Sequence, residues 1–413
     1  MIKSEKRTLN NGLRVLVHVD KSTPLAAINL LYQVGAKNEH PDKTGFAHLF
    51  EHLMFGGSKN IPSYDTPLQQ VGGDNNAWTN NDVTNYYLTV PAANLETGFW
   101  LESDRMLELD FSEESLEVQR KVVIEEFKQR YLNQPYGDIP LLLRPLAYKE
   151  HPYQWPTIGK EIKHIEQATL EDVKNFFYHH YAPNNAILVI SGNVDPDNAF
   201  QLAEKWFGDI PRGDIANPVI PAEPEQTQAR ELSVERDVPA DLIQMVFHIG
   251  GRTNDDFYAT DLLSDVLSNG PSSRLNQSLI KDQKLFGEVN AYISGDHHPG
   301  LLTVMGRLLP GTTMEHAQSA IWEQLDGIRQ TAVSDYELQK VKNKVESSLV
   351  FSEINFLNKA MNLAQFEMLG QADEINQEVD KYRAVTNASL LEAAQRTFRK
   401  ENSSTLFYNA RKK

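Results

Sequence analysis

One short stretch of the sequence combines residue types that could bind a metal ion and activate water: His48-Leu49-Phe50-Glu51-His52. On a helix, residues four apart share a face, so both imidazoles can reach one ion. Glu51 lies beside them and can act as a general base on a water molecule there. This H-x-x-E-H order is the inverse of the common H-E-x-x-H zinc motif. The alternative is a helix with two core histidines, but burying them without a polar partner would be costly.

A catalytic zinc site needs a third protein ligand and one open position. The chain has no cysteine, so this ligand should be a carboxylate or another histidine. Residues 112–130 are predicted to form a long helix that contains Glu125 and Glu126. Glu126 has valines three and four positions before it and should face the core, whereas Glu125 has lysine neighbours and should be solvated. We therefore expect His48, His52 and Glu126 to bind one zinc ion.

These residues resemble the inverzincin metallopeptidases, the family that includes pitrilysin, insulin-degrading enzyme and the mitochondrial processing peptidase. The family follows H-x-x-E-H with a V-V-x-x-E-type helix, and residues 121–126 are similar to it. The resemblance covers essentially the whole chain. It implies a zinc-dependent endopeptidase, with His48, His52 and Glu126 as ligands and Glu51 as general base. The family often has a second glutamate in the same helix, where this chain has Gln119.

A second stretch, residues 75–86, resembles the family's N-A-x-T-x-x-x-T-x-Y segment, whose edge strand pairs with the substrate backbone. The resemblance implies that Asn76, Ala77 and Trp78 bind substrate, with Trp78 lining a side-chain pocket beside the metal. Pairing at a strand edge tolerates many sequences, which suits a peptidase of mixed substrates. The alternative is an ordinary half-buried strand, in which threonine, tyrosine and tryptophan are common.

Active family members also need an arginine and a tyrosine that hold the substrate carbonyl. The matching stretch, residues 279–289, has Ile280 and Gly287 at these positions, and neither side chain can donate a hydrogen bond. The resemblance therefore implies a heterodimer with a related subunit that lacks zinc and supplies the pair. A self-sufficient homodimer and a non-catalytic assembly or scaffold subunit are the alternatives, although the presence of all four site residues favours the enzyme. Arg274 could substitute as donor, but a structural arginine at a helix start is the more ordinary interpretation.

The elements that must position these residues follow from hydrophobic periodicity. Ser112 is expected to cap the helix that carries Glu126. Strands are predicted at residues 13–19, 25–32, 85–90 and 186–190, and helices at 45–55, 112–130 and 196–207.

The second half of the chain resembles the first weakly, as expected after an internal duplication. Three short matches recur in the same order, pairing 31–35 with 246–250, 117–121 with 337–341, and 168–171 with 388–391. We therefore expect an α+β fold of two similar domains, each a mostly antiparallel sheet packed with helices. The predicted boundaries are a metal-bearing domain at 1–210, a proline-rich linker at 211–229 and a related domain at 230–413. Generic αβ similarity is the alternative.

This alignment places His48, Glu51 and His52 near Asp261, Ser264 and Asp265. No imidazole remains there, so one metal ion per chain is expected.

Composition narrows the classes of partner. The chain of 413 residues has 40 basic and 56 acidic residues and a net charge of −16, which disfavours binding to nucleic acid. No apolar run is long enough to span a bilayer. Residues 1–7 lack the apolar core of a secretory signal, so the expected location is the cytoplasm, or the periplasm if a signal peptide has been removed.

Overall fold

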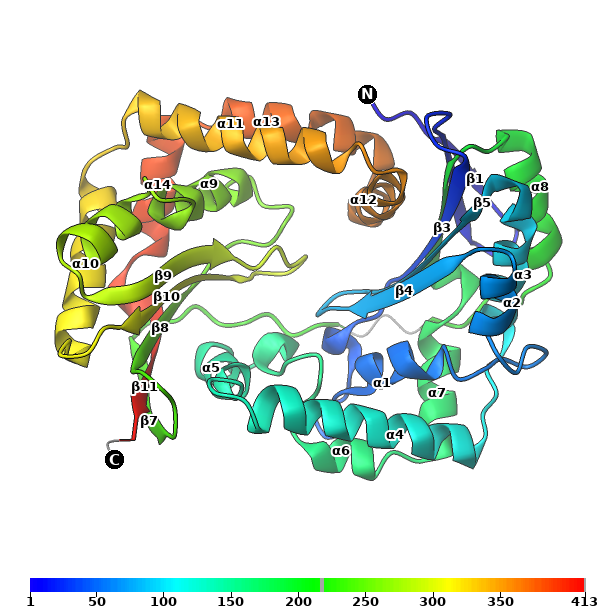
Figure 1. Cartoon of the computed structure of the whole chain (residues 1–413), viewed down its shortest axis with the longest axis horizontal. Coiled ribbons are helices and arrows are strands. Elements are labelled where there is room, and N and C mark those ends of the chain that lie inside the picture. The colour runs from blue at the N-terminus through cyan, green and yellow to red at the C-terminus, as the bar shows by residue number, and fades with distance from the viewer. Residues whose placement is uncertain (216–218, 412–413) are drawn as a thin grey trace. The chain divides into compact units, whose positions relative to one another are not determined.

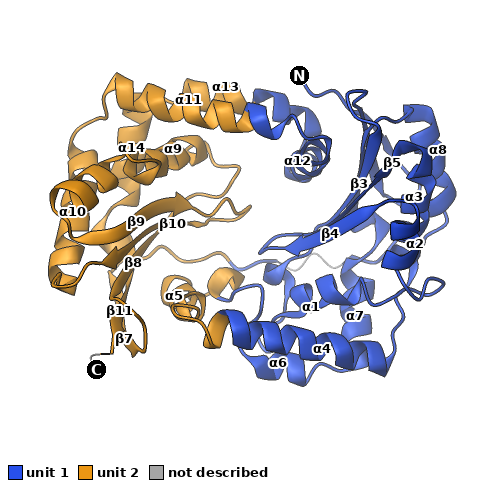
Figure 2. Cartoon of the chain, in the orientation of Figure 1, with its two compact units in different colours: residues 1–130, 155–221, 350–377 blue, residues 131–154, 222–349, 378–413 orange. Residues whose placement is uncertain are grey.

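The computed structural model of the chain describes residues 1–215 and 219–411 (Figure 1). Two compact units are present (Figure 2). Unit 1 comprises Met1–Arg130, Trp155–Pro221 and Val350–Gln377, and unit 2 comprises Tyr131–Gln154, Ala222–Leu349 and Glu378–Lys413. Each unit holds one sheet with packed helices, which confirms the α+β class.

The sheet of unit 1 has six strands in the order β1-β2-β6-β3-β5-β4. Only the β2–β6 pair is parallel, so the sheet is mostly antiparallel as expected. The strands are β1 (Glu5–Thr8), β2 (Arg14–Val19), β3 (Leu25–Tyr32), β4 (Asp74–Thr79), β5 (Thr84–Pro91) and β6 (Ala186–Gly192).

Helices cover both faces of this sheet (Figure 1). On one face lie α3 (Leu95–Leu107) and α8 (Pro196–Phe207), and on the other lies α12 (Phe356–Leu369). Two residues of β3, three positions apart, show the two faces. Ile28 points toward Gly98 of α3, whereas Leu31 packs with the apolar residues of α12. Burial on both sides explains why β3 and β6 are almost continuously apolar.

The sheet of unit 2 has five strands in the order β7-β11-β8-β10-β9, with β7–β11 as its one parallel pair. This order and these directions repeat those of β2-β6-β3-β5-β4 in unit 1, so the internal duplication is confirmed. The strands are β7 (Arg230–Arg236), β8 (Leu242–His248), β9 (Phe286–Ile293), β10 (Leu301–Leu308) and β11 (Ser403–Ala410).

The three short sequence matches all fall on equivalent elements. The first pair covers the ends of β3 and β8, the second lies inside α4 and α11, and the third begins α7 and α14. The remaining α-helices are α1 (Phe46–Leu53), α2 (Asp65–Gln70), α4 (Glu113–Phe127), α5 (Ile139–Ala147), α6 (Ile162–Glu166), α7 (Leu170–His180), α9 (Phe257–Ser268), α10 (Met314–Gln330), α11 (Asp335–Ser352), α13 (Glu378–Ala384) and α14 (Asn387–Thr397).

The compact units differ from the contiguous domains expected from the sequence, because two helices are exchanged. In unit 1, α12 packs on β2, β3 and β6, and in unit 2 its equivalent α5 packs on β7, β8 and β11. Hydrophobic periodicity predicts that a helix has an apolar face but does not reveal which sheet that face covers. Within the expected linker at 211–229, residues 216–218 lie outside the described residues.

Over the described parts of the chain, no helix is both long and apolar enough to cross a membrane.

Candidate metal centre

Helix α1 carries the H-x-x-E-H motif and begins at a position that only glycine can occupy. Gly45 has φ 89°, and a Cβ there would lie 2.6 Å from the Ile158 carbonyl oxygen. The helix buries Phe46, Ala47, Leu49, Phe50 and Leu53. The apolar residues hold one face of the helix in the core, so His48, Glu51 and His52 lie along its remaining surface.

The carboxylate of Glu39 secures the start of α1. Its Oε2 accepts a hydrogen bond from the Gly45 amide at 2.9 Å, and its Oε1 accepts one from the Ala47 amide at 2.8 Å. Trp155 Nε1 also donates to Oε2, at 3.1 Å. Burial raises the pKa of Glu39 to about 8. These bonds satisfy backbone donors that the first helical turn leaves unpaired, and sequence reasoning missed this residue because isolated acids before helices are common.

Three side chains meet at the site that the sequence predicts. Glu126 Oε2 lies 3.6 Å from His48 Nε2 and 3.4 Å from His52 Nε2. Within the described residues, His48, His52 and Glu126 form the one group of three or more such side chains that could hold a metal ion. Two ligands of a tetrahedral zinc ion lie about 3.4 Å apart, given metal–ligand distances of about 2.0–2.2 Å. The three side chains, called the metal group below, therefore fit zinc.

The ionisation states also suit a metal site. Burial lowers the pKa of His48 to about 4, so its imidazole is neutral near pH 7 and can act as a ligand. A hydrogen bond with His52 is the main cause of the lowered pKa of Glu126. This carboxyl group is therefore ionised, and the metal group combines two imidazoles with one negative charge, a common ligand set for catalytic zinc.

Glu51 lies next to the metal group and has a different environment from Glu126. Burial raises the pKa of its carboxyl group, although a hydrogen bond from Thr79 at the end of β4 opposes that shift. A carboxylate with a raised pKa accepts a proton more readily near neutral pH. The geometry therefore allows Glu51 to act as a general base beside a metal ion.

The two neighbouring glutamates of α4 differ in position. The Glu126 side chain is 17% exposed and faces the histidines, whereas Glu125 is 61% exposed and pairs with Lys128 at 2.7 Å. The buried Val123 supports the expected orientation, but Val122 is itself 45% exposed. Of the two valines that the sequence analysis used to orient Glu126 toward the core, only Val123 is buried.

The start of α4 also agrees with the sequence. The Ser112 side chain accepts a hydrogen bond from the Ser115 amide at 3.2 Å and caps the helix. The α-helical hydrogen bonding ends at Phe127, however, and the chain continues as a π-helical turn, Lys128–Leu132.

Strand β4 is the edge strand of the unit 1 sheet and contacts α1. Thr79 points toward Glu51, so Ala77 shares its face while Asn76 and Trp78 point to the other. Trp78 accordingly packs against the apolar cluster that includes α12. The alternation of the strand puts the indole on the opposite face of the sheet from Glu51, contrary to the expectation of a Trp78 pocket beside the metal.

Two matches with known proteins decide the family. The description "Insulinase (Peptidase family M16)" matches residues 14–160, and "Peptidase M16 inactive domain" matches residues 167–345. Together they cover most of the chain, in the order of the two halves.

The chain belongs to the M16 peptidase family.

Individual relatives agree with this assignment. "Zinc protease PqqE" of Helicobacter pylori is 28% identical over 412 residues, covering 98% of this chain and 92% of the relative. The "uncharacterized zinc protease YmxG" of Bacillus subtilis is 24% identical, covering 93% of each chain. The crystal structure of a protease from Helicobacter pylori superposes with a TM-score of 0.94 at 27% identity, over 99% of this chain and 100% of that chain.

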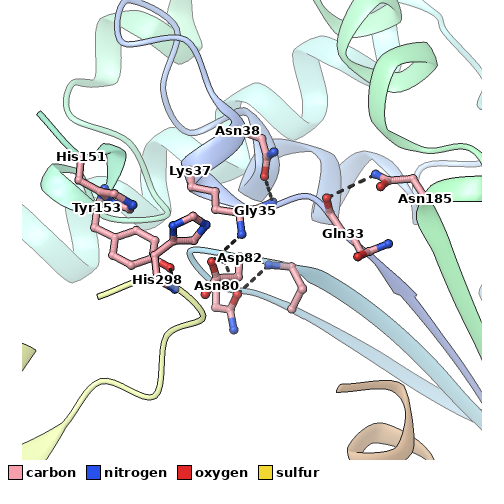
Figure 3. A network of polar contacts seen from close by, with 11 residues as sticks. Gln33, Gly35, Lys37, Asn38, Asn80, Asp82, His151, Tyr153, Asn185 and His298 are labelled. Carbon is pink, nitrogen blue, oxygen red and sulfur yellow. Dashed lines mark hydrogen bonds and ion pairs between the residues drawn. The ribbon is translucent and has the colours of Figure 1, made fainter. Parts of the chain in front are cut away.

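The turn after β4 is fastened to the loop that precedes α1 (Figure 3). The Lys37 amide donates to the Asn81 carbonyl at 2.9 Å, and Lys37 Nζ donates to Asp82 Oδ1 at 2.8 Å. At Gly35 an added Cβ would lie 2.6 Å from the carbonyl oxygens of Asn80 and Asn81. The loop before α1 therefore holds the turn after the edge strand β4 close to the helix that carries the H-x-x-E-H motif.

Unit 2 contains no equivalent of the metal group among its described residues. In the duplicated helix α9, Asp261 accepts a hydrogen bond from the Tyr382 hydroxyl at 2.5 Å, and Asp265 accepts one from Asn269 at 2.7 Å. Burial raises the pKa of Asp265 to about 6. These carboxyl groups are engaged within unit 2, in keeping with the description of the second M16 match as an inactive domain.

The stretch that the sequence analysis matched to the arginine and tyrosine of active family members, residues 279–289, belongs to the fold of unit 2. Ile280 lies in the π-helical segment Asn276–Asp282 and packs against the core of unit 2, and Gly287 lies in β9. Arg274 binds Glu337 of α11 through two hydrogen bonds, Nε–Oε1 at 2.9 Å and Nη2–Oε2 at 3.1 Å. The arginine is thus engaged in a structural ion pair within its own unit.

Proposed function

We propose that this chain is the zinc-bearing subunit of an M16 endopeptidase that hydrolyses peptides or unfolded polypeptides. The convergence of His48 Nε2, His52 Nε2 and Glu126 Oε2 within 4.8 Å is the observation that carries the proposal. The printed names of the relatives in Helicobacter pylori and Bacillus subtilis, both zinc proteases, support it. Zinc, when bound, would polarise the scissile carbonyl and make a water molecule more acidic.

The residues of the chain itself supply the remaining functions. Glu51 takes a proton from the attacking water and passes it to the departing amine, which its raised pKa favours. β4 is the edge strand of its sheet, and an extended substrate would pair with its outer edge at Asn76 and Ala77, where the Ala77 amide would exchange its 2.8 Å hydrogen bond to Asn76 Oδ1 for one to the substrate.

A related partner subunit is part of the proposal. Stabilising the oxyanion of peptide hydrolysis needs a donor beyond the metal group. Ile280 and Gly287 cannot donate a side-chain hydrogen bond, and Arg274 is held by Glu337. We therefore propose a heterodimer in which a subunit without zinc supplies an arginine and a tyrosine.

Cleavage of a quenched-fluorescent peptide mixture tests both parts. The zinc-loaded chain is assayed alone and with its related subunit, with Glu51→Gln as the inactive variant and Glu125→Gln as the matched control. We expect cleavage only with the partner, abolished by Glu51→Gln and retained by Glu125→Gln. Cleavage by the chain alone would refute the need for a partner and indicate a self-sufficient homodimer. No cleavage with the partner present would refute the peptidase and indicate a scaffold subunit.

A further inference from the structure

The two carboxylate oxygens of Glu126 have different partners. Oε2 faces both histidines, at 3.6 Å from His48 and 3.4 Å from His52. Oε1 instead forms an ion pair with Arg130, whose Nη1 lies 2.8 Å away. Only one oxygen of this carboxylate is therefore free of another cation and directed at the other members of the metal group.

The backbone places Arg130 at this oxygen. Arg130 follows Glu126 by four residues and lies in the π-helical turn Lys128–Leu132 at the end of α4. Such turns are rare and are frequently found at functional sites. Arg130 is also a minor cause of the pKa shifts of His48, Glu51 and Glu126, in keeping with its contact with Glu126.

The ion pair has little structural value. The Arg130 side chain is 69% exposed, and pairs involving such exposed groups typically add less than about 1 kcal/mol to stability. The adjacent pair Lys128–Glu125 is exposed in the same way but does not touch a member of the metal group. The chain thus provides a matched pair of helix-end cations, of which one contacts a ligand residue.

We infer that Arg130 is a positioning residue that keeps Glu126 a one-oxygen ligand. A carboxylate can bind a metal through one oxygen or through both, and a catalytic zinc site must retain an open position. With Oε1 held in the ion pair with Arg130, Glu126 would offer Oε2 alone to a metal ion, and a position would remain open to water and substrate. This inference rests on the proposed metal site but not on which substrate is cleaved.

Cobalt(II) provides a direct readout, since its visible absorption weakens when coordination rises from four to five. The full-length chain is loaded with Co²⁺ as wild type, Arg130→Met, Arg130→Lys and Lys128→Met, after circular dichroism has shown that each variant is folded. We expect Arg130→Met to lose absorption intensity, Arg130→Lys to recover part of it, and Lys128→Met to match wild type. With the zinc-loaded complex, kcat should fall about 10-fold or more in Arg130→Met while KM is unchanged.

The outcomes separate this inference from the proposed function. A wild-type spectrum for Arg130→Met would overturn the inference, whatever its activity. An equal spectral change in Lys128→Met would also overturn it, because the effect would then be one of general surface charge. If wild type binds no Co²⁺, both the inference and the proposed metal site fail. If wild type binds Co²⁺ but the zinc-loaded complex cleaves nothing, the peptidase fails, while the spectra still test Arg130.

Discussion

At the scale of single residues, the two neighbouring glutamates of α4 have opposite environments. Glu126 Oε2 lies within 3.6 Å of both histidine Nε2 atoms, whereas Glu125 is 61% exposed and pairs with Lys128. Replacing a residue that merely supports a metal ligand costs about 10- to 100-fold in affinity. A change to a ligand itself should therefore cost at least about 100-fold.

We expect Glu126→Gln to weaken zinc binding by at least about 100-fold and Glu125→Gln to leave it unchanged. Competition between the protein and a chromophoric chelator measures both affinities. Equal affinities for the two variants would exclude Glu126 as a ligand.

Some of the site residues could be predicted from the sequence and others could not. The spacing of His48, Glu51 and His52 is a local property of one helix, so it could be read from the chain. The partner of α1, Glu39, could not, because its role depends on a fold that brings Trp155 to the same carboxylate. For Trp78, the resemblance suggested contact with substrate, but only the register of β4 decides which face the side chain occupies.

At the scale of elements, Arg274 and Glu337 join α11 to the short helical turn that runs into the π-helical segment of unit 2. The hydrogen bond from Arg274 lowers the pKa of Glu337 to about 2. In the unfolded chain this pKa is about 4.3. The pair therefore stabilises the folded protein above pH about 4.3, and this contribution is lost as the pH falls toward 2.

We expect Arg274→Met to reduce the free energy of unfolding by about 1–2 kcal/mol at pH 7. Hydrogen bonds to charged groups contribute about 1.5–3 kcal/mol, and this pair is 25% and 27% exposed, which weakens it. The difference should shrink between pH 4.3 and the lowest pH at which both proteins remain folded. Urea titrations of metal-free protein measure it. A difference that does not vary with pH would show that Arg274 stabilises the fold through packing instead.

At the scale of the whole molecule, the duplication was visible in the sequence but the exchange of helices was not. The three weak matches fall on equivalent strands and helices, because each preserves a local pattern of apolar residues. The pairing of α12 with the sheet of unit 1 joins segments more than 150 residues apart along the chain, from β6 (Ala186–Gly192) to α12 (Phe356–Leu369). Local periodicity carries no information about such a distant choice.

Because α12 packs on the sheet of unit 1, a fragment that ends before α12 should fold poorly. Residues 1–210 contain the whole metal group but lack α12, whose Ala360, Leu363 and Ala364 are fully buried against the unit 1 sheet. Without this helix the apolar face formed by Leu31, Ile187 and Val189 would be open to water, at a cost of about 25 cal/mol per Å² of apolar surface.

We therefore expect a fragment of residues 1–221 alone to be aggregated or loosely folded and to bind zinc weakly. Adding a separate peptide of residues 350–377 should restore a cooperative thermal transition and zinc binding. A control peptide with Leu363→Asp should fail, because it places a charge in the interface that α12 buries. If the fragment folds cooperatively and binds zinc without the peptide, the contiguous boundary at 210 is the better description of the folding unit, and α12 only covers a domain that is already formed.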